Sequence, residues 1–396
     1  MMISAILSNP DHPDYGVVTI PFPIPHDQYA HCMELLEALE VGDAVKADCK
    51  MEKIDSFYTV IKRMEILTVN VEELNYLAKR LDGFDAGEAA QFQAMAHKLE
   101  LFELKDLINL TFCCQQATVI TDFSDLATVG RDHYMNLHGG SAPVDELNTL
   151  DGEKVARQLI ESGNGTVTPY GVVYDNAMKL EQIYQDREFP CYYYEPNPIT
   201  IALTSKTEPE DTKHITWLFL PMAQEEIGRA IQRAGIADSD EVCLRLEDSQ
   251  LPDEVDVLLD MELESLSDLN ALAQAANGLP NDDLNKLGAV VALAKPQTAA
   301  QIKNLIENLD LFDFTPGAHT PEEYGKYMIR QSGHFEYDEN LDDFYDYAKY
   351  GTERMNEEDG MFTDRGYIAY KGDVGMEEAM ESGQTDRMGF QMGGLV

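Results

Sequence analysis

The chain has 396 residues, with 72 Asp and Glu against 29 Lys and Arg, and a formal net charge of −43. An acidic excess of this size repels phosphates, so direct binding to nucleic acid or to an anionic membrane is excluded. Hydrophobic residues make up 44% of the chain, which is enough for packed cores and rules out a disordered acidic tail. A cationic partner surface or a demand for solubility would explain the charge, and the length favours two or more domains.

Targeting and redox signals point to the cytoplasm. No segment approaches the roughly 20 apolar residues that a membrane helix needs. The N-terminus has no basic region and only a short apolar stretch, so we expect no signal peptide. The six cysteines show neither CxxC pairs nor metal-finger spacing, and we expect reduced, mostly buried thiols; they are Cys32, Cys49, Cys113, Cys114, Cys191 and Cys243.

The first half predicts a mixed α+β unit. Short strands are expected near 3–8 and 16–22, then a helix from Pro25 to about Glu40, then strands near 44–50 and 57–67. A helical hairpin follows, capped by Asn70 with Glu73 reaching back. Its apolar face has helical spacing and comprises Val71, Leu74, Leu77, Ala78 and Leu81. Further helices run to about 137, and a helix and a small hairpin around a Gly-x-x-Thr-x-x-Gly block close the unit.

The second half repeats these blocks at a constant offset of 195 or 196 residues. Ile3–Asn9 matches Ile199–Ser205, and Val71–Ala78 matches Leu266–Ala273, where Ser265 and Asp268 take the capping positions. Three glycines also recur at this offset, since Gly83, Gly130 and Gly165 align with Gly278, Gly325 and Gly360. The spacing predicts a tandem duplication with units over 1–197 and 198–371. A Gly- and Met-rich tail over 372–396 is expected to be flexible.

One acidic segment alternates with a period of two. In Glu254–Glu264, the positions Val255, Val257, Leu259, Met261 and Leu263 interleave with acids, which predicts a half-buried strand with an acidic outer face. Same-face residues of a strand lie roughly 6.7 Å apart, and B-DNA repeats a phosphate about every 3.4 Å per strand. The carboxylates of Glu254, Asp256, Asp260, Glu262 and Glu264 could therefore imitate a phosphate row. The alternative is a solvated edge strand whose charges prevent aggregation.

A second acidic group spans 336–359. Leu341, Phe344, Tyr345 and Tyr347 are expected to supply its packing. Its candidate mimic acids are Glu336, Asp338, Glu339, Asp342, Asp343, Asp346, Glu353, Glu357, Glu358 and Asp359. Like charges three and four residues apart destabilise a helix, so their retention suggests selection for something other than stability.

Familiar catalytic and metal-binding patterns do not occur. The chain has no zinc motif, Gly163–Gly165 lacks the lysine of a phosphate loop, and Asp338–Asp343 lacks the Gly and Glu of a calcium loop. We therefore expect no enzyme activity, no cofactor and no metal, although a scattered Cys/His nucleophile stays open.

The block Leu341–Gly351 has a distinctive spacing of Leu341, Asp346, Tyr347, Tyr350 and Gly351. These residues match the antirestriction motif of the ArdA antirestriction family, which most of residues 199–370 resemble. The family continues with Arg-Asp where this chain has Thr352 and Glu353. In the first half Asp151 aligns with Asp346, but Gly152 replaces the tyrosine, which puts an equivalent role there in doubt.

The resemblance implies an elongated DNA-mimic fold, encoded on mobile elements, made here of two tandem ArdA-like units with several small subdomains each. It also implies inhibition of type I restriction–modification enzymes by competition for the DNA-binding channel of their methyltransferase core. Two such units in one chain would form a pseudo-dimer, and further homodimerisation is possible. The residues alone indicate only an acidic decoy and name neither the target enzyme nor whether methylation is blocked besides cleavage.

Competing interpretations are a halophilic globular protein, an acidic scaffold or histone-like chaperone, and a carboxylate-based hydrolase. Clustered acids disfavour the first, and the lack of long acidic runs disfavours the second. The third needs paired carboxylates in a cleft. If charge acts collectively, Asp342→Asn should matter little, whereas Tyr347→Ala should loosen packing, either between the units or inside one core.

Overall fold

A computed structural model describes residues 3–185, 187–237, 241–334 and 336–382. Helices and small antiparallel sheets alternate along the chain, so the fold is α+β, as predicted. The chain forms two compact units. The first comprises Met1–Glu195, Thr204–Trp217 and Ala223–Val242, and the second comprises Pro196–Leu203, Leu218–Met222 and Cys243–Val396. Within the described part of the chain, no helix is long and apolar enough to cross a membrane.

The first unit begins with a four-stranded sheet in the order β2-β1-β3-β4. Its strands are β1 (Ile3–Ser8), β2 (Val17–Phe22), β3 (Cys49–Ser56) and β4 (Thr68–Val69). Strand β1 pairs antiparallel with β2 from Ile3–Phe22 to Ser8–Val17. Ile3, Ala5 and Leu7 on one face of β1 are fully buried, as expected for alternate residues of a strand that covers a core.

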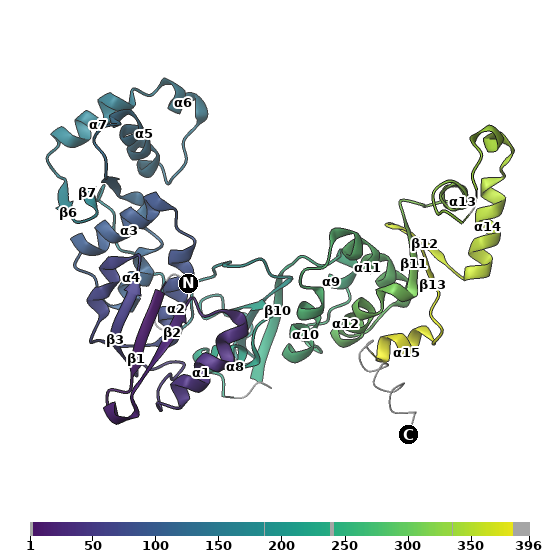
Figure 1. Cartoon of the computed structure of the whole chain (residues 1–396), viewed down its shortest axis with the longest axis horizontal. Helices are drawn as coiled ribbons and strands as arrows, with labels where there is room; N and C mark the ends of the chain where they lie inside the picture. Colours follow the sequence, from purple (N-terminus) through teal and green to yellow (C-terminus); the bar gives the residue numbers. More distant parts are fainter. Residues whose placement is uncertain (1–2, 186, 238–240, 335, 383–396) are drawn as a thin grey trace. The chain divides into compact units, whose positions relative to one another are not determined.

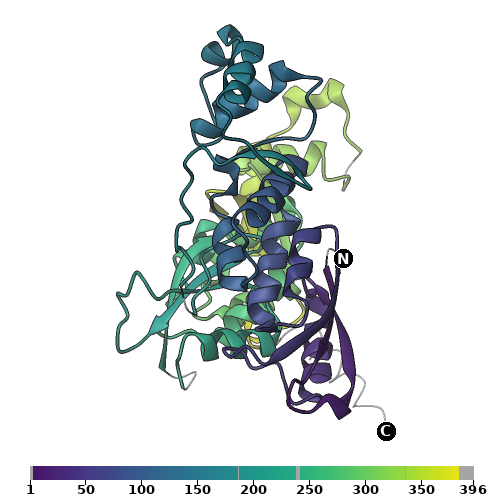
Figure 2. The same ribbon diagram turned by 90° about the vertical axis from the view of Figure 1, so that its left-hand side faces the viewer.

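Helix α2 (Val71–Asp82) contacts β2 of this sheet, α4 (Leu104–Leu110) packs against α2, and α3 (Ala86–Lys98) contacts α4 (Figures 1 and 2). The predicted apolar face of α2 is confirmed, because Val71, Leu74, Leu77, Ala78 and Leu81 are all fully buried. The Asn70 side chain accepts a hydrogen bond from the Glu73 amide at 3.0 Å, which caps the helix. The Glu73 carboxylate, however, accepts from the Tyr184 hydroxyl at 2.6 Å instead of reaching back to Asn70.

The first unit continues with a small sheet and three helices. The sheet has the order β5-β7-β6, with β5 (Thr118–Ile120), β6 (Thr166–Thr168) and β7 (Gly171–Tyr174). The helices are α5 (Leu126–Leu137), α6 (Val144–Thr149) and α7 (Gly152–Glu161). The predicted strand over 57–67 is wrong, because Thr59–Met64 is a 3-10 helix, and α1 covers Tyr29–Glu37 within the helix expected from Pro25 to about Glu40.

The rest of the chain adds further small antiparallel sheets and helices. A three-stranded sheet has the order β10-β8-β9, and a later one has the order β11-β13-β12. The strands are β8 (Ile199–Ser205), β9 (Thr216–Leu220), β10 (Val242–Ser249), β11 (Phe312–Pro316), β12 (Met361–Thr363) and β13 (Gly366–Tyr370). The helices are α8 (Gln224–Arg233), α9 (Asp253–Asp256), α10 (Leu266–Ala276), α11 (Asn281–Ala294), α12 (Ala299–Glu307), α13 (Pro321–Arg330), α14 (Tyr347–Glu358) and α15 (Met376–Glu381).

Helix α8 does not follow the predicted boundary at 197/198, because it groups with the first unit. Its arginines explain this grouping. Arg229 contacts the carboxylate of Glu72, and Arg233, which is only 4% exposed, donates to the Ala44 carbonyl at 2.7 Å and to the Tyr184 hydroxyl at 2.9 Å. Buried guanidinium groups need such partners, so these contacts fix α8 in the first unit.

The expected flexible tail is wrong for its first part. Helix α15 packs against α12, where Asn304 donates to the Met380 carbonyl at 2.8 Å and Asn308 donates to the Ala379 carbonyl at 3.2 Å. These amides satisfy carbonyls at the end of α15 that the helix itself leaves free. Residues 383–396 of the predicted tail lie outside the described residues.

Candidate partner-binding surface

The acidic group over 336–359 lies on a helix pair of the second unit. Helices α13 and α14 lie side by side next to the sheet of β11, β12 and β13 (Figure 1). Thr320 caps α13 by accepting from the Glu323 amide at 3.2 Å, and Pro321 is suited to a first helical position. Asp346 caps α14 by accepting from the Lys349 amide at 3.0 Å, so this motif residue starts the helix.

Two glycines let the helices touch backbone to backbone. A Cβ atom on Gly351 would lie 1.8 Å from the Pro321 carbonyl oxygen, and one on Gly325 would lie 2.0 Å from the Tyr347 carbonyl oxygen. No real side chain tolerates such distances, so both positions require glycine at this crossing. The glycine of the motif therefore has a packing role.

Asp342 is held in a cluster of its own. Its carboxylate accepts from Arg330 Nε at 3.0 Å and from the Tyr337 hydroxyl at 2.7 Å, and it also contacts the Tyr347 hydroxyl. The hydroxyls of Tyr347 and Tyr337, followed by Arg330, lower the pKa of Asp342 to about 2. Asp342 is thus a structural acid that joins the loop before α14 to α13.

Of the residues expected to supply packing, some are buried and others are exposed. Tyr347 is 7% exposed and Tyr350 is partly buried against the core around Tyr324 and Tyr367. Leu341 and Phe344, by contrast, are 47% and 83% exposed on the 3-10 turn Glu339–Phe344, so the prediction that they pack inside is wrong. Their turn is too short to carry one face continuously toward a core.

Most acids of this group face solvent. Glu357 and Glu358 pair with Arg354, and Glu358 also accepts from the Tyr324 hydroxyl at 2.6 Å, so Glu358 serves the core. Lys349 lies 4.0 Å from Glu353, a weak exposed contact. The exposed acids are Glu336, Asp338, Glu339, Asp343, Asp346, Glu353, Glu357 and Asp359. They make the negative surface of the helix pair.

The predicted strand over 254–264 is wrong. Asp253–Asp256 is a single helical turn after Pro252, and turns follow it. Val257 and Leu263 are 84% and 83% exposed, so the alternating apolar residues do not share a buried face. The turn begins because proline is set for a helix start, and the Asp260 carboxylate, which accepts from the Glu262 amide at 3.1 Å, holds a bend that a strand cannot contain.

The acids of this segment do different jobs. Glu254 binds Arg365 through both oxygens at 2.7 Å. Burial raises the pKa values of Asp256 and Glu264, and Glu264 accepts from the Ala299 amide at 2.9 Å. Asp260 and Glu262 alone among the five expected mimic acids are exposed.

The acidic surface lies in a segment that matches a known protein family. Residues 212–369 match the family described as "Antirestriction protein (ArdA)". This segment belongs to the ArdA family. Antirestriction is the function that this family implies. A comparison with curated proteins gives no significant match.

The ArdA segment, residues 212–369, contains both acidic groups and the Leu341–Gly351 block. The residues that sequence reasoning missed are the cations that neutralise some of these acids. Arg330 lies 12 positions from Asp342, and Arg365 lies 111 positions from Glu254. No local pattern joins such pairs, because only the folded chain brings the turn before α14 to α13, and the β12–β13 turn to α9.

Across the residues that the structure describes, no group of three or more His, Cys, Asp or Glu side chains is placed to hold a metal ion. Four cysteines, Cys32, Cys49, Cys113 and Cys114, are buried as free thiols. Burial raises the pKa of Cys32 and Cys113, which disfavours the reactive thiolate.

Proposed function

We propose that the chain is an acidic DNA mimic that inhibits type I restriction–modification enzymes by occupying the DNA-binding channel of their methyltransferase core. The observation that carries this proposal is the set of exposed acids on the α13–α14 pair inside the ArdA segment. Exposed carboxylates keep their charge available to a partner, and a cationic channel built for phosphates would attract them. The protein acts as a stoichiometric ligand and not as an enzyme.

We also propose that the first half of the chain is a divergent ArdA-like unit, fused to the ArdA segment of the second half. Equivalent positions, 195 residues apart, make equivalent contacts. Asp151 caps α7 by accepting from the Lys154 amide at 3.1 Å, as Asp346 does at α14. Thr168 and Thr363 donate to Gly171 and Gly366 carbonyls at 2.8 and 2.9 Å. A Cβ atom added to Gly130 would lie 1.8 Å from the Gly152 carbonyl oxygen, so α5 and α7 cross as closely as α13 and α14.

A competition experiment tests the proposed function. A fluorescent duplex that carries the recognition site is bound to a type I methyltransferase core, and the full chain is titrated in at several salt concentrations. The chain should displace the duplex at a stoichiometric ratio, and its affinity should fall as salt rises because ion pairs are screened. Methylation and cleavage should both be inhibited, since both reactions need bound DNA.

Three outcomes would contradict the proposal. A stable ternary complex with DNA still in the channel would show that the chain binds elsewhere. Inhibition by substoichiometric amounts would indicate turnover. An equal effect from an unrelated protein of similar net charge would reduce the mechanism to nonspecific acidity.

A further inference from the structure

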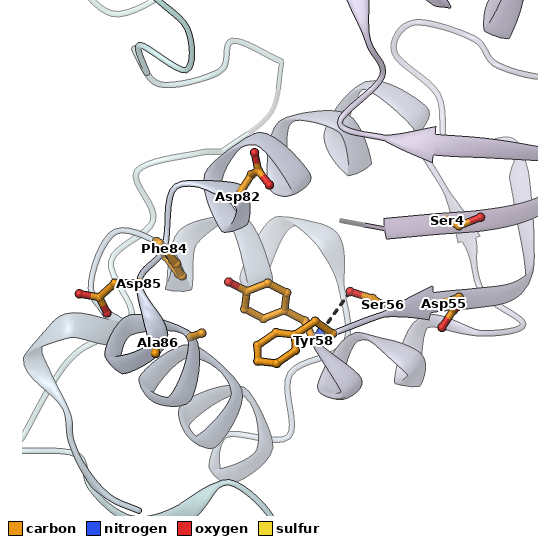
Figure 3. A pocket seen from close by; sticks show the side chains of 10 residues that line it. Ser4, Asp55, Ser56, Tyr58, Asp82, Phe84, Asp85 and Ala86 are labelled. Carbon is orange, nitrogen blue, oxygen red and sulfur yellow. Dashed lines mark hydrogen bonds between the residues drawn. The ribbon is translucent and has the colours of Figure 1, made fainter. Parts of the chain in front are cut away.

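A pocket of about 520 Å³ opens in the first unit, between the end of β3 and the connection from α2 to α3 (Figure 3). Three carboxylates line it, from Asp55, Asp82 and Asp85, together with the rings of Phe57 and Phe84. Ser4 and Ser56 add hydroxyl groups, and no Lys or Arg is among the lining residues. The pocket thus combines negative charge with aromatic surface.

Two aromatic rings that line the pocket pack against the buried ring of Phe92. The Tyr58 and Phe84 rings both pack edge-on against Phe92, with ring centroids 5.9 and 6.1 Å apart. Phe57 stands edge-on to Tyr58 at 5.6 Å and is 72% exposed. The face of an exposed aromatic ring attracts cations.

Two of the three carboxylates are oriented by hydrogen bonds. Asp82 accepts from the Tyr194 hydroxyl at 2.6 Å, and Asp85 accepts from the Glu88 amide at 2.9 Å as the cap of α3. These partners are a hydroxyl and a backbone amide, and neither carries a positive charge. Burial, followed by the charge of Asp82, raises the pKa of Tyr58 to about 12.

The matching positions of the second half carry partly different chemistry. Strand β10 ends as β3 does, because the Ser249 hydroxyl accepts from the Leu251 amide as the Ser56 hydroxyl accepts from the Tyr58 amide, both at 3.1 Å; Asp248 therefore takes the place of Asp55 and Gln250 that of Phe57. Counting 195 residues on, Asp82, Phe84 and Asp85 become Asn277, Leu279 and Pro280. Two of the three charges and both rings are thus absent from these positions of the second half.

We propose that this pocket binds the guanidinium group of an arginine side chain on the DNA-binding surface of the partner enzyme. The proposal rests on the proposed function, because that function supplies a partner surface rich in arginine. Arginine fits better than lysine, since a flat guanidinium can stack on an aromatic ring and also donate several N–H groups to carboxylates. The first unit would then contribute a discrete anchor, and the second unit a distributed negative surface.

A small-molecule probe tests the pocket without any partner. Nα-acetyl-arginine N-methylamide is titrated into the full chain while amide NMR signals of Ser56, Ala86 and Ala89 are followed. The matched ligand is the citrulline analogue, which has nearly the same shape but no charge. Shifts at these pocket residues with the arginine probe, and at least tenfold weaker binding of the citrulline probe, are expected. Equal responses to both probes, or no response at the pocket, would overturn the proposal.

Paired variants test the pocket in the complex. Phe57→Ala with Asp55→Asn removes the exposed ring and one charge, and it spares the helix cap at Asp85. Phe102→Ala with Glu100→Gln is the control, because it removes a 46% exposed ring and an exposed acid elsewhere in the unit. We expect the pocket pair to weaken methyltransferase binding about tenfold, as expected for one cation–aromatic and ion-pair anchor, and the control pair to change it less than twofold.

The failures of the two proposals are distinguishable. If the unchanged chain displaces no DNA from the methyltransferase, the proposed function fails and the arginine probe alone decides the pocket. If the unchanged chain competes normally and both variant pairs behave alike while retaining their fold, the pocket proposal is wrong.

Discussion

Neighbouring acids in this protein have different physical roles. Asp342 accepts hydrogen bonds from Arg330, Tyr337 and Tyr347, whereas Asp343, the next residue, is exposed. The prediction that Asp342→Asn matters little concerns the summed field and stays a prediction for inhibition. For stability the two residues differ, because an amide at position 342 has only one acceptor oxygen and cannot satisfy the same three donors.

Asp342→Asn and Asp343→Asn form a matched pair, since each removes one negative charge from the same turn. Asp342→Asn should lower the midpoint of thermal unfolding of the second unit by a few degrees, whereas Asp343→Asn should leave it unchanged or raise it slightly by relieving repulsion. Differential scanning calorimetry of the full chain measures both. Equal midpoints for the two variants would show that the cluster around Asp342 contributes nothing to stability.

At the scale of elements, the crossing of α13 and α14 depends on glycine. Gly351→Ala should force the helices apart and destabilise the fold by roughly 1–3 kcal/mol, as overpacked sites typically do. The control is Gly228→Ala in α8, where an added Cβ meets nothing within 4 Å. That change should stabilise the fold by about 0.5–1 kcal/mol, because alanine is the better helix former. Urea denaturation compares them, and a neutral Gly351→Ala would refute the close crossing.

Sequence patterns succeeded where one period dominates a long segment. The apolar residues of α2 repeat with helical spacing over 12 residues, and capping residues mark the starts of α2 and α10 at Asn70 and Ser265. The segment 254–264 failed because period-two alternation over a short stretch also fits successive turns. The distant partners Arg330 and Arg365 left no local signal, so the division of acids into paired and free groups needed the structure.

For the whole molecule, a net charge of −43 is informative only together with the position of the acids. Some acidic side chains form hydrogen bonds or ion pairs within the units, as Glu254, Glu264 and Glu358 do. The charges left for a partner are the exposed ones, and a field summed over many of them loses little when one is removed. This distinguishes a mimic from a site that depends on one carboxylate.

A graded neutralisation of exposed acids tests this central claim most directly. Asp260, Glu262, Glu336, Glu339, Asp343 and Asp359 are changed to amides singly, in threes and all together, and displacement of duplex DNA from the methyltransferase core is measured for each variant. The account predicts that single changes weaken displacement of the duplex less than threefold and that triple changes weaken it further. The variant with all six changes should lose most of its ability to displace DNA. Abolition of displacement by any one of the single changes, with the fold intact by circular dichroism, would contradict it and indicate a discrete site.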